Sequence, residues 1–149
     1  MFTHFAEWGQ KLAEHLSTRF DNPVGCYHGG QSRGARDQLV ADFQALEGPG
    51  TLVLSLKAGG TGLNLTNANH VILYDRWWNP AVEQQAIDRT HRIGQTKNIF
   101  AYRMICNDTV EDKILKLQDR KRSLAKDLIS DEDGFVKSLT KDDIAYLFS

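Results

Sequence analysis

The chain has 149 residues, and its 18 Lys and Arg side chains against 19 Asp and Glu side chains give a formal net charge of −1. This length fits one domain, and a composition of 41% hydrophobic and 25% charged residues excludes an intrinsically disordered chain. No apolar run approaches the ~20 residues that cross a bilayer, so no membrane partner is expected. The two cysteines, Cys26 and Cys106, are too few for a disulfide framework or a zinc site, and their apolar surroundings predict buried thiols.

The chain begins with a short apolar segment and an amphipathic pattern. Residues 1–3 are all that is present of the strand that an α/β sheet places before its first helix. A truncated first strand implies either lower stability or an open sheet edge. The spacings of three and four that follow predict a helix with one buried face, formed by Phe5, Trp8, Leu12, Leu16 and Phe20.

The next segments alternate between strand and helix. Residues 24–28 predict a short strand that ends in a His-Gly-Gly loop. The helix after this loop is expected to turn four apolar side chains inward: Leu39, Val40, Phe43 and Leu46. Residues 51–56 form a continuous β-prone run, which is typical of a strand covered on both faces of a sheet.

The second half of the chain continues the alternation. Residues 70–74 and 98–105 predict two more strands, and residues 81–91 between them predict a helix. A long helix over residues 109–129 follows, and Thr140 is expected to cap a short final helix. Because strands alternate with helices, we expect a mostly parallel sheet with helices on both faces.

A glycine-rich stretch, Ser55 to Asn64, follows the strand predicted over residues 51–56. Its glycines let backbone amides approach an anion closely, as in loops that bind phosphate, although tight packing alone explains such turns equally well. The Gly-Lys-Ser/Thr ending of a Walker A loop is absent here and elsewhere in the chain. A phosphate-loop hydrolase that works as a single domain is therefore excluded.

A second motif places Gln85, Arg89 and Arg92 at positions i, i+4 and i+7 of a predicted helix, so that they share one face. Arginine stays charged and binds phosphate oxygens through two parallel hydrogen bonds. Two arginines about one turn apart are what a phosphoryl-transfer site needs to neutralise the charge that develops on the transferred phosphate. A solvated helix face with surface ion pairs is the alternative.

Two adjacent tryptophans, Trp77 and Trp78, follow the strand predicted over residues 70–74. Neighbouring side chains in a strand point to opposite faces, so the two rings cannot both enter the same core. One ring is then available to stack on a base or a sugar, unless a local bend buries both rings.

These motifs stand in an order that is specific to one family. The segment KAGGTGLNLTNANHVILYDRWWNP, followed by DRTHRIGQ, resembles the second RecA-like lobe of SWI2/SNF2-type ATPases in helicase superfamily 2. FTHF and YHGGQSRGARDQLVADF also match, and the ending TVEDKILKLQDRKRSLAKDLI is similar to that of bacterial SNF2 helicases of the Rad54-like type. The resemblance implies a RecA-like α/β three-layer sandwich over residues 1–108, with a truncated first strand, and a C-terminal helical extension packed on it over residues 109–149.

The resemblance also implies a role for each matching residue. Arg89 and Arg92 are expected to act as arginine fingers in catalysis, with Gln85 at the leading position of their motif. Gly62 and Asn64 are expected to touch the nucleotide. The residues expected to lie on the DNA are Gly29, Arg33, Arg36, Lys57, Gly59, Gly60 and Trp78.

The activity implied by the resemblance is that of an ATP-dependent translocase or remodeller on double-stranded DNA, in the bacterial cytoplasm at the nucleoid. ATP and Mg²⁺ would be held mainly by an N-terminal RecA-like lobe of the same polypeptide, and no metal ligand is expected in this chain. The isolated chain is therefore expected to be inactive. The alternative is a catalytically eroded RecA-like module that binds nucleic acid or another protein.

Two other functions fit the residues less well. A Rossmann oxidoreductase needs G-x-G-x-x-G, and no third glycine follows Gly60-Thr61-Gly62 at the required distance. An RNA-directed helicase belongs to the same superfamily, but DRWWNP and HRIGQ favour the SNF2 branch.

Taken over the whole chain, the net charge of −1 argues against nucleic acid, because proteins that bind it usually carry excess Lys and Arg. The charge is unevenly distributed, however. Residues 57–103 carry six basic and three acidic side chains, whereas residues 130–149 carry two basic and five acidic side chains. We therefore expect a local DNA contact that is shared with the other lobe and weak in this chain alone.

Overall fold

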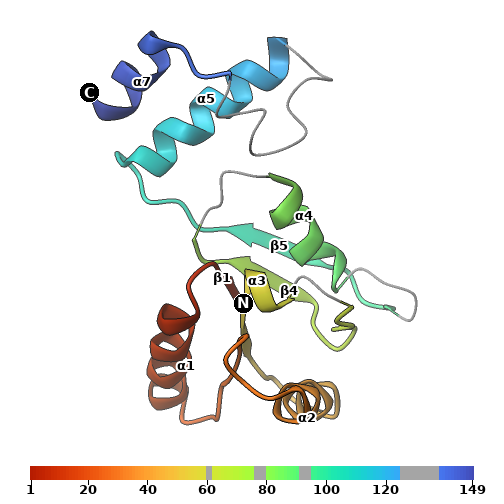
Figure 1. The fold of residues 1–149 in the computed structure, drawn as a ribbon. Coiled ribbons are helices and arrows are strands. Elements are labelled where there is room, and N and C mark those ends of the chain that lie inside the picture. Colours follow the sequence, from red (N-terminus) through yellow and green to blue (C-terminus); the bar gives the residue numbers. More distant parts are fainter. Residues whose placement is uncertain (60–61, 76–79, 91–94, 125–137) are drawn as a thin grey trace.

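The computed structural model describes residues 1–59, 62–75, 80–90, 95–124 and 138–149 of the chain (Figure 1). In chain order, the elements are β1 (Phe2–Thr3), α1 (Ala6–Phe20), β2 (Gly25–Tyr27), α2 (Arg33–Gln44), β3 (Leu52–Ser55), α3 (Leu56–Gly59), β4 (His70–Leu73), α4 (Pro80–Asp88), β5 (Phe100–Arg103), α5 (Val110–Leu124) and α7 (Lys141–Phe148). Within these ranges, no helix is long and apolar enough to cross a membrane.

The predicted strands are confirmed in type and position, and the predicted helices are confirmed in type. The helix predicted over residues 81–91 is wrong at its end, because α4 ends at Asp88 and Arg89 lies in the turn that follows it. Residues 125–129 of the helix predicted over residues 109–129 lie outside the described part of the chain. Strands β2 to β5 fall within the four ranges predicted for them, and every residue of β3 is buried, as expected for a strand covered on both faces. Thr140 caps α7 through a capping box. Its hydroxyl accepts a hydrogen bond from the backbone N–H of Asp143 at 3.2 Å, and the Asp143 carboxylate accepts one from the Thr140 N–H at 2.8 Å.

The strands form one parallel sheet in the order β2-β3-β1-β4-β5. The two-residue strand β1 lies at its centre, with Phe2 in register with Leu54 of β3 and with Leu73 of β4. Backbone bonds on both sides hold it there, because Met1 O accepts from the N–H of Leu54 at 2.8 Å and Phe2 O accepts from that of Tyr74 at 2.9 Å. An open edge at the first strand, one of the two expected consequences of its shortness, is therefore excluded.

Helices cover both faces of the sheet, which confirms the three-layer α/β sandwich expected from the sequence (Figure 1). One face packs against α2 and α4 around a core that includes Phe2 and Leu54. The other face packs against α1 at Gly9, where an added Cβ would lie only 3.1 Å from Cγ2 of Thr3. Glycine at this position therefore lets the helix approach the sheet closely.

The buried face of α1 differs from the predicted one. Gly9 and Ala13 are its buried residues, whereas the side chains of Phe5, Trp8 and Phe20 are 61%, 45% and 66% exposed. The predicted buried face is therefore wrong for these three rings, whereas Leu12 and Leu16 of the same face are half-buried. The close approach of α1 to the sheet leaves room only for small side chains at the contact.

Two smaller predictions about burial are also wrong. Leu46 was expected to face inward but is exposed, because α2 ends at Gln44 and the chain has already left the helix. Cys106 was expected to be buried and is exposed, since it lies in the segment that leaves the sheet after β5. Cys26 on β2 is half-buried, and burial raises the pKa of its thiol.

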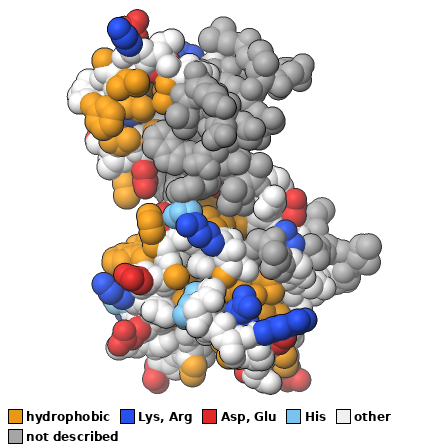
Figure 2. Space-filling view, in the orientation of Figure 1, with side chains coloured by type: hydrophobic (Ala, Val, Ile, Leu, Met, Phe, Trp, Pro, Cys, Tyr) orange, Lys and Arg blue, Asp and Glu red, His pale blue; other side chains and the backbone are white. Residues whose placement is uncertain are grey.

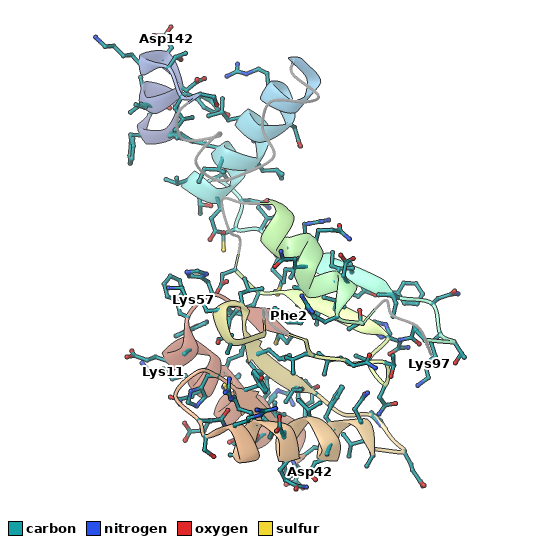
Figure 3. All side chains as sticks on the ribbon, turned by 45° about the vertical axis from the view of Figure 1, so that its right-hand side comes forward. Phe2, Lys11, Asp42, Lys57, Lys97 and Asp142 are labelled. Atoms are coloured by element: carbon teal, nitrogen blue, oxygen red, sulfur yellow. The ribbon has the colours of Figure 1, made fainter. Side chains whose placement is uncertain are left out.

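The helices α5 and α7 pack against each other. Leu117 and Leu147 are buried between them, with Ile114 and Leu139 packed against this pair. In Figure 2, hydrophobic side chains gather on the surface around α7, and Figure 3 shows Asp142 at the outer side of that helix. A domain boundary between residues 108 and 109, and packing of the extension on the lobe, stay predictions.

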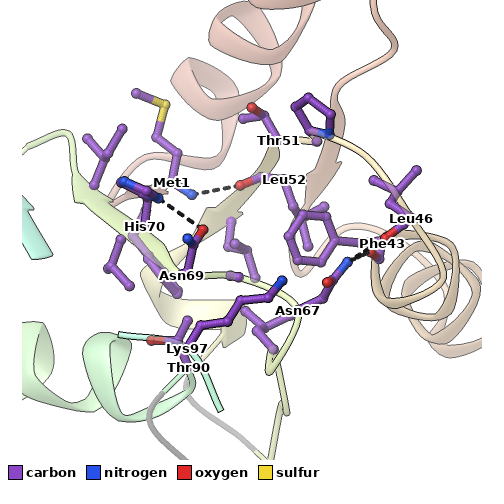
Figure 4. A pocket seen from close by; sticks show the side chains of 18 of the residues that line it. Met1, Phe43, Leu46, Thr51, Leu52, Asn67, Asn69, His70, Thr90 and Lys97 are labelled. Carbon is purple, nitrogen blue, oxygen red and sulfur yellow. Dashed lines mark hydrogen bonds between the residues drawn. The ribbon is translucent and has the colours of Figure 1, made fainter. Parts of the chain in front are cut away.

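A cavity of about 420 Å³ lies at the amino ends of the central strands (Figure 4). Its lining includes Met1, Asn69 and His70. The α-amino group of Met1 donates a hydrogen bond to Leu52 O at 2.7 Å, and burial lowers the pKa of this amino group from 8.0 to about 5.

In the chain of 149 residues purified alone, this buried amino group predicts a pH-dependent stability, which a polypeptide with both lobes would lack because the nitrogen of Met1 is then part of a peptide bond. The unfolded chain protonates the Met1 amino group below pH 8, whereas the folded chain keeps it neutral down to about pH 5. Stability is therefore complete above pH 8 and falls as the pH drops toward 5, by up to roughly 4 kcal/mol. Urea unfolding at the two pH values measures the difference. An N-terminally acetylated chain is the control, and an unchanged pH dependence in it would assign the effect to other groups.

Candidate functional site

The carboxyl ends of β1, β2 and β3 border a second cavity, of about 720 Å³. Parallel α/β sheets bind ligands at this edge, at the point where the order of the strands reverses, and β1 is that point in this sheet. The residues that line the cavity are His4, Phe5, Ala6, Glu7, Gly29, Gly30, Arg36, Ser55, Lys57 and Ala58. Three residues predicted to lie on DNA, Gly29, Arg36 and Lys57, are thus brought together from three segments of the chain.

Lys57 and Arg36 reach the cavity from different sides. Lys57 lies on α3, directly after β3, and Figure 3 shows it beside the start of α1. Ser32 caps α2 by accepting the N–H of Ala35 at 3.2 Å, which places Arg36 one turn into that helix. Among the described residues, the buried Nε of Arg36 has no hydrogen-bond partner. Two cations against the single carboxylate of Glu7 make the lining suited to an anion.

The loop after β2 is held in place by the side chain of His28. The N–H of Gly30 donates to Nδ1 of His28 at 3.2 Å, and Nε2 of the same ring lies 2.8 Å from Nε2 of Gln10 on α1. The N–H of His28 donates to Oε1 of Gln31 at 3.0 Å. These bonds fix the backbone on which Gly29 lies at the cavity wall.

Arg33 is placed differently from Arg36. Its side chain is almost fully exposed and pairs with Asp37 across one turn of α2, with Nε 3.7 Å from Oδ2. It is not among the residues that line the cavity. An exposed pair of this kind contributes little to stability, so Arg33 can exchange Asp37 for another anion at small cost.

Asp75 joins the ends of the two central strands, and the sequence analysis did not single it out. Its carboxylate accepts hydrogen bonds from the hydroxyl of Thr3 and, at 2.7 Å, from the N–H of His4. These contacts connect the end of β4 to the segment that enters the cavity. The only sequence signal was a carboxylate directly after a strand.

A second group of predicted residues gathers around the end of α4. Gln85 is exposed on this helix, and Arg89 is half-buried in the turn that follows it. The carbonyl of Arg89 accepts from the N–H of Leu65 at 3.0 Å. The glycine-rich stretch with Gly62 and Asn64 is thereby held near Arg89. Gly62 has φ +68°, a left-handed conformation that favours glycine.

Gln95 holds together the other side of the residues around the end of α4, and no sequence motif indicated this role. Its Nε2 donates to the carbonyls of Thr66 and Ala68, both at 2.9 Å, and to that of Thr90 at 3.2 Å. Its Oε1 accepts from the N–H of Lys97 at 2.8 Å. The side chain therefore ties the end of the DRTHRIGQ motif to the loop that follows the glycine-rich stretch.

An ion pair between a buried glutamate and a half-exposed arginine connects α4 to β5. Glu83 is only 2% exposed, and its Oε2 lies 2.9 Å from Nε of Arg103. The hydrogen bond that Nε of Arg103 donates to Oε2 stabilises the buried carboxylate of Glu83. This bond fixes α4 on the sheet.

Several predicted site residues lie outside the described part of the chain: Gly60, Trp78 and Arg92. Gly59 is the last residue of α3, directly beyond the cavity residue Ala58. Among the described residues, no group of three His, Cys, Asp or Glu side chains is arranged to hold a metal ion.

Comparison with known proteins shows the family. Residues 1–94 match the model of the helicase conserved C-terminal domain. The chain is 46% identical over all of its length to YwqA of Bacillus subtilis, whose name describes an ATP-dependent helicase or translocase, and it spans 16% of that protein. The chain thus corresponds to about a sixth of this relative.

Solved structures agree with this assignment. The Sulfolobus solfataricus SWI2/SNF2 ATPase core in complex with dsDNA matches 98% of the chain with a TM-score of 0.78 and 37% identity, over 30% of its own length. The C-terminal domain of the Sulfolobus solfataricus SWI2/SNF2 ATPase matches 98% of the chain with a TM-score of 0.72 and 34% identity, over 58% of its length. The chain therefore belongs to the helicase conserved C-terminal domain family and is a C-terminal lobe of the SWI2/SNF2 type.

Proposed function

We propose that this chain is the second lobe of an ATP-dependent translocase on double-stranded DNA. The observation that carries the proposal is the cavity at the carboxyl edge of the sheet, which brings Gly29, Arg36 and Lys57 together. The dsDNA bound to the Sulfolobus solfataricus ATPase core supports duplex DNA as the partner. Contacts to the phosphate backbone give affinity without sequence specificity, as a translocase requires.

The proposed DNA-binding surface extends around this cavity. Arg36 and Lys57 carry the charge that binds phosphate oxygens, and the backbone at Gly29, Gly59 and Gly60 approaches the DNA closely. Arg33 and Trp78 add contacts at the margin. This surface is one half of a track that the other lobe completes.

The proposed nucleotide-facing surface lies at the end of α4. Arg89 and Arg92 act as arginine fingers, which neutralise negative charge on the phosphate that is transferred, and Gln85 precedes them on α4. Gly62 and Asn64 contact the nucleotide from the adjoining loop. The hydrogen bond between Leu65 and Arg89 supports this arrangement, because it holds the two segments together.

The cofactors of the proposed activity are ATP and Mg²⁺, held mainly by an N-terminal RecA-like lobe of the same polypeptide. The residues present here fit the phosphate end of a nucleotide, since they supply cations and glycine backbone. Closure of the two lobes brings Arg89 and Arg92 to the phosphates, and reopening releases them. Repeated closure moves the lobes along the duplex without separating its strands.

Purified alone, the chain of 149 residues is expected to hydrolyse no ATP, with or without duplex DNA. The reason is that the arginines act on a phosphate which the other lobe must hold. Phosphate release measured with and without DNA tests this, and a polypeptide that carries both lobes is the positive control. DNA-stimulated hydrolysis by the isolated chain would contradict the proposal. A two-lobed polypeptide that binds DNA but does not hydrolyse ATP would instead indicate an eroded module.

A further inference from the structure

Two aromatic rings at the start of α1 are exposed on the surface. Phe5 and Trp8 are three residues apart and are 61% and 45% exposed. The ring of Trp8 lies 6.3 Å from that of Tyr74, and the ring of Phe5 packs edge-on against His4 at 5.0 Å. We refer to Phe5, Trp8 and Tyr74 as the aromatic rim. Clustered apolar side chains at a surface generally mark a binding site, because their exposure to water is unfavourable.

The aromatic rim is continuous with the basic cavity. Phe5 lines the cavity together with Arg36 and Lys57, and Tyr74 directly precedes Asp75, which is bonded to Thr3 and His4. In the view of Figure 2, hydrophobic and basic side chains lie next to one another at the level of the start of α1. The surface therefore offers apolar rings and cations side by side.

This combination matches the chemistry of a nucleic-acid backbone. Each phosphate carries a negative charge, and the deoxyribose between two phosphates presents an apolar face. An apolar protein groove would satisfy the rings but would leave the cations of the cavity and the buried Nε of Arg36 without an anion. The charge of the cavity therefore favours DNA over a protein partner.

We propose that the aromatic rim packs on the deoxyribose faces of duplex DNA, while Arg36 and Lys57 contact the adjoining phosphates. The inference rests on the proposed function, and it adds a contact that does not depend on charge.

The test measures how the affinity for DNA depends on salt. Binding of a fluorescent DNA duplex is followed by anisotropy between about 50 and 200 mM salt. Phe5→Ala and Trp8→Ala are expected to weaken binding at least about fivefold at every salt concentration, as for lost aromatic contacts to nucleic acid. Because rings release no counterions, the slope of log Kd against log salt stays unchanged. In Arg36→Ala and Lys57→Ala, the slope falls by about one.

The matched control is Phe20→Ala. Phe20 lies at the opposite end of the same helix and is as exposed as Phe5, but it is remote from the cavity lining. This variant is expected to bind DNA as the unchanged chain does. Urea midpoints equal to that of the unchanged chain are expected for Phe5→Ala and Phe20→Ala, whose rings are largely exposed. The midpoint of Trp8→Ala shows how much of its effect comes from stability, because Trp8 is only 45% exposed and lies against Tyr74.

The remaining outcomes contradict either the proposed function or the binding of DNA by the aromatic rim alone. An unchanged chain that shows no salt-dependent binding to duplex DNA contradicts the proposed function, and this inference with it. Binding that weakens in the charge variants but not in Phe5→Ala and Trp8→Ala overturns the inference alone. Loss of self-association in the ring variants, at unchanged DNA affinity, would make the rim a protein interface and overturn it as well.

Discussion

Replacing Arg92 by alanine in a polypeptide that carries both lobes is expected to lower ATP turnover by about 10³–10⁵-fold, and Arg89→Ala should act in the same direction. The physical reason is that an arginine finger interacts most strongly with the charge that develops in the transition state. It adds little to the binding of ATP in the ground state. The affinity for ATP is therefore expected to stay close to that of the unchanged protein.

Steady-state hydrolysis and the binding of a fluorescent ATP analogue measure the two effects separately. Gln84→Ala is the control on the same helix, because Gln84 is exposed and bonds only to Asp88, at 2.9 Å, among the described contacts. Its turnover is expected to be unchanged. Near-normal turnover in Arg92→Ala would assign that arginine to the structure of the lobe.

Gln95→Glu hardly changes the size of the side chain, yet it is expected to lower the stability of the chain strongly. The amide of Gln95 donates to three carbonyl oxygens, and a carboxylate in its place would face the same three oxygens without a donor. Loss of these bonds and repulsion between the oxygens should lower the free energy of unfolding by about 3 kcal/mol. ATP turnover of a two-lobed polypeptide should fall too, because Gln95 holds the loop beside Arg89.

The pH dependence of this variant identifies the cause. A protonated glutamic acid regains one donor, so the loss of stability should be smallest at low pH and grow as the carboxyl group ionises. Urea midpoints across this range provide the measurement. Asn98→Asp adds the same charge at an exposed position of the same loop and is expected to leave the midpoint unchanged. A midpoint for Gln95→Glu equal to that of Asn98→Asp would show that the three bonds are unimportant.

The sequence predicted the strands and the helix cap that depend on short local patterns of residues. Strands β2 to β5 were found from continuous β-prone runs, and the cap of α7 from Thr140. Gly29, Arg36 and Lys57 were expected on one DNA-binding surface only because of the resemblance to SNF2 ATPases. Their meeting at one cavity agrees with the general rule that the carboxyl ends of parallel strands converge at one edge.

The sequence did not predict features that depend on distant backbone groups. Asp75 and Gln95 bond to groups that lie far along the chain, and no spacing pattern marks such partners. The buried face of α1 was mistaken for a related reason. A period of 3.6 residues shows that apolar side chains share a side, but not whether Gly9 brings a different side against the sheet.

The central position of β1 has a consequence for how the chain folds. Phe2 pairs with Leu54 on one side and with Leu73 on the other, so these residues have no partner until both later strands exist. Neither pairing is local, and each requires closure of a long loop before its hydrogen bonds form. Folding of the sheet is therefore expected to end, not begin, at β1, with β3 and β4 forming the slot that Phe2–Thr3 enters last.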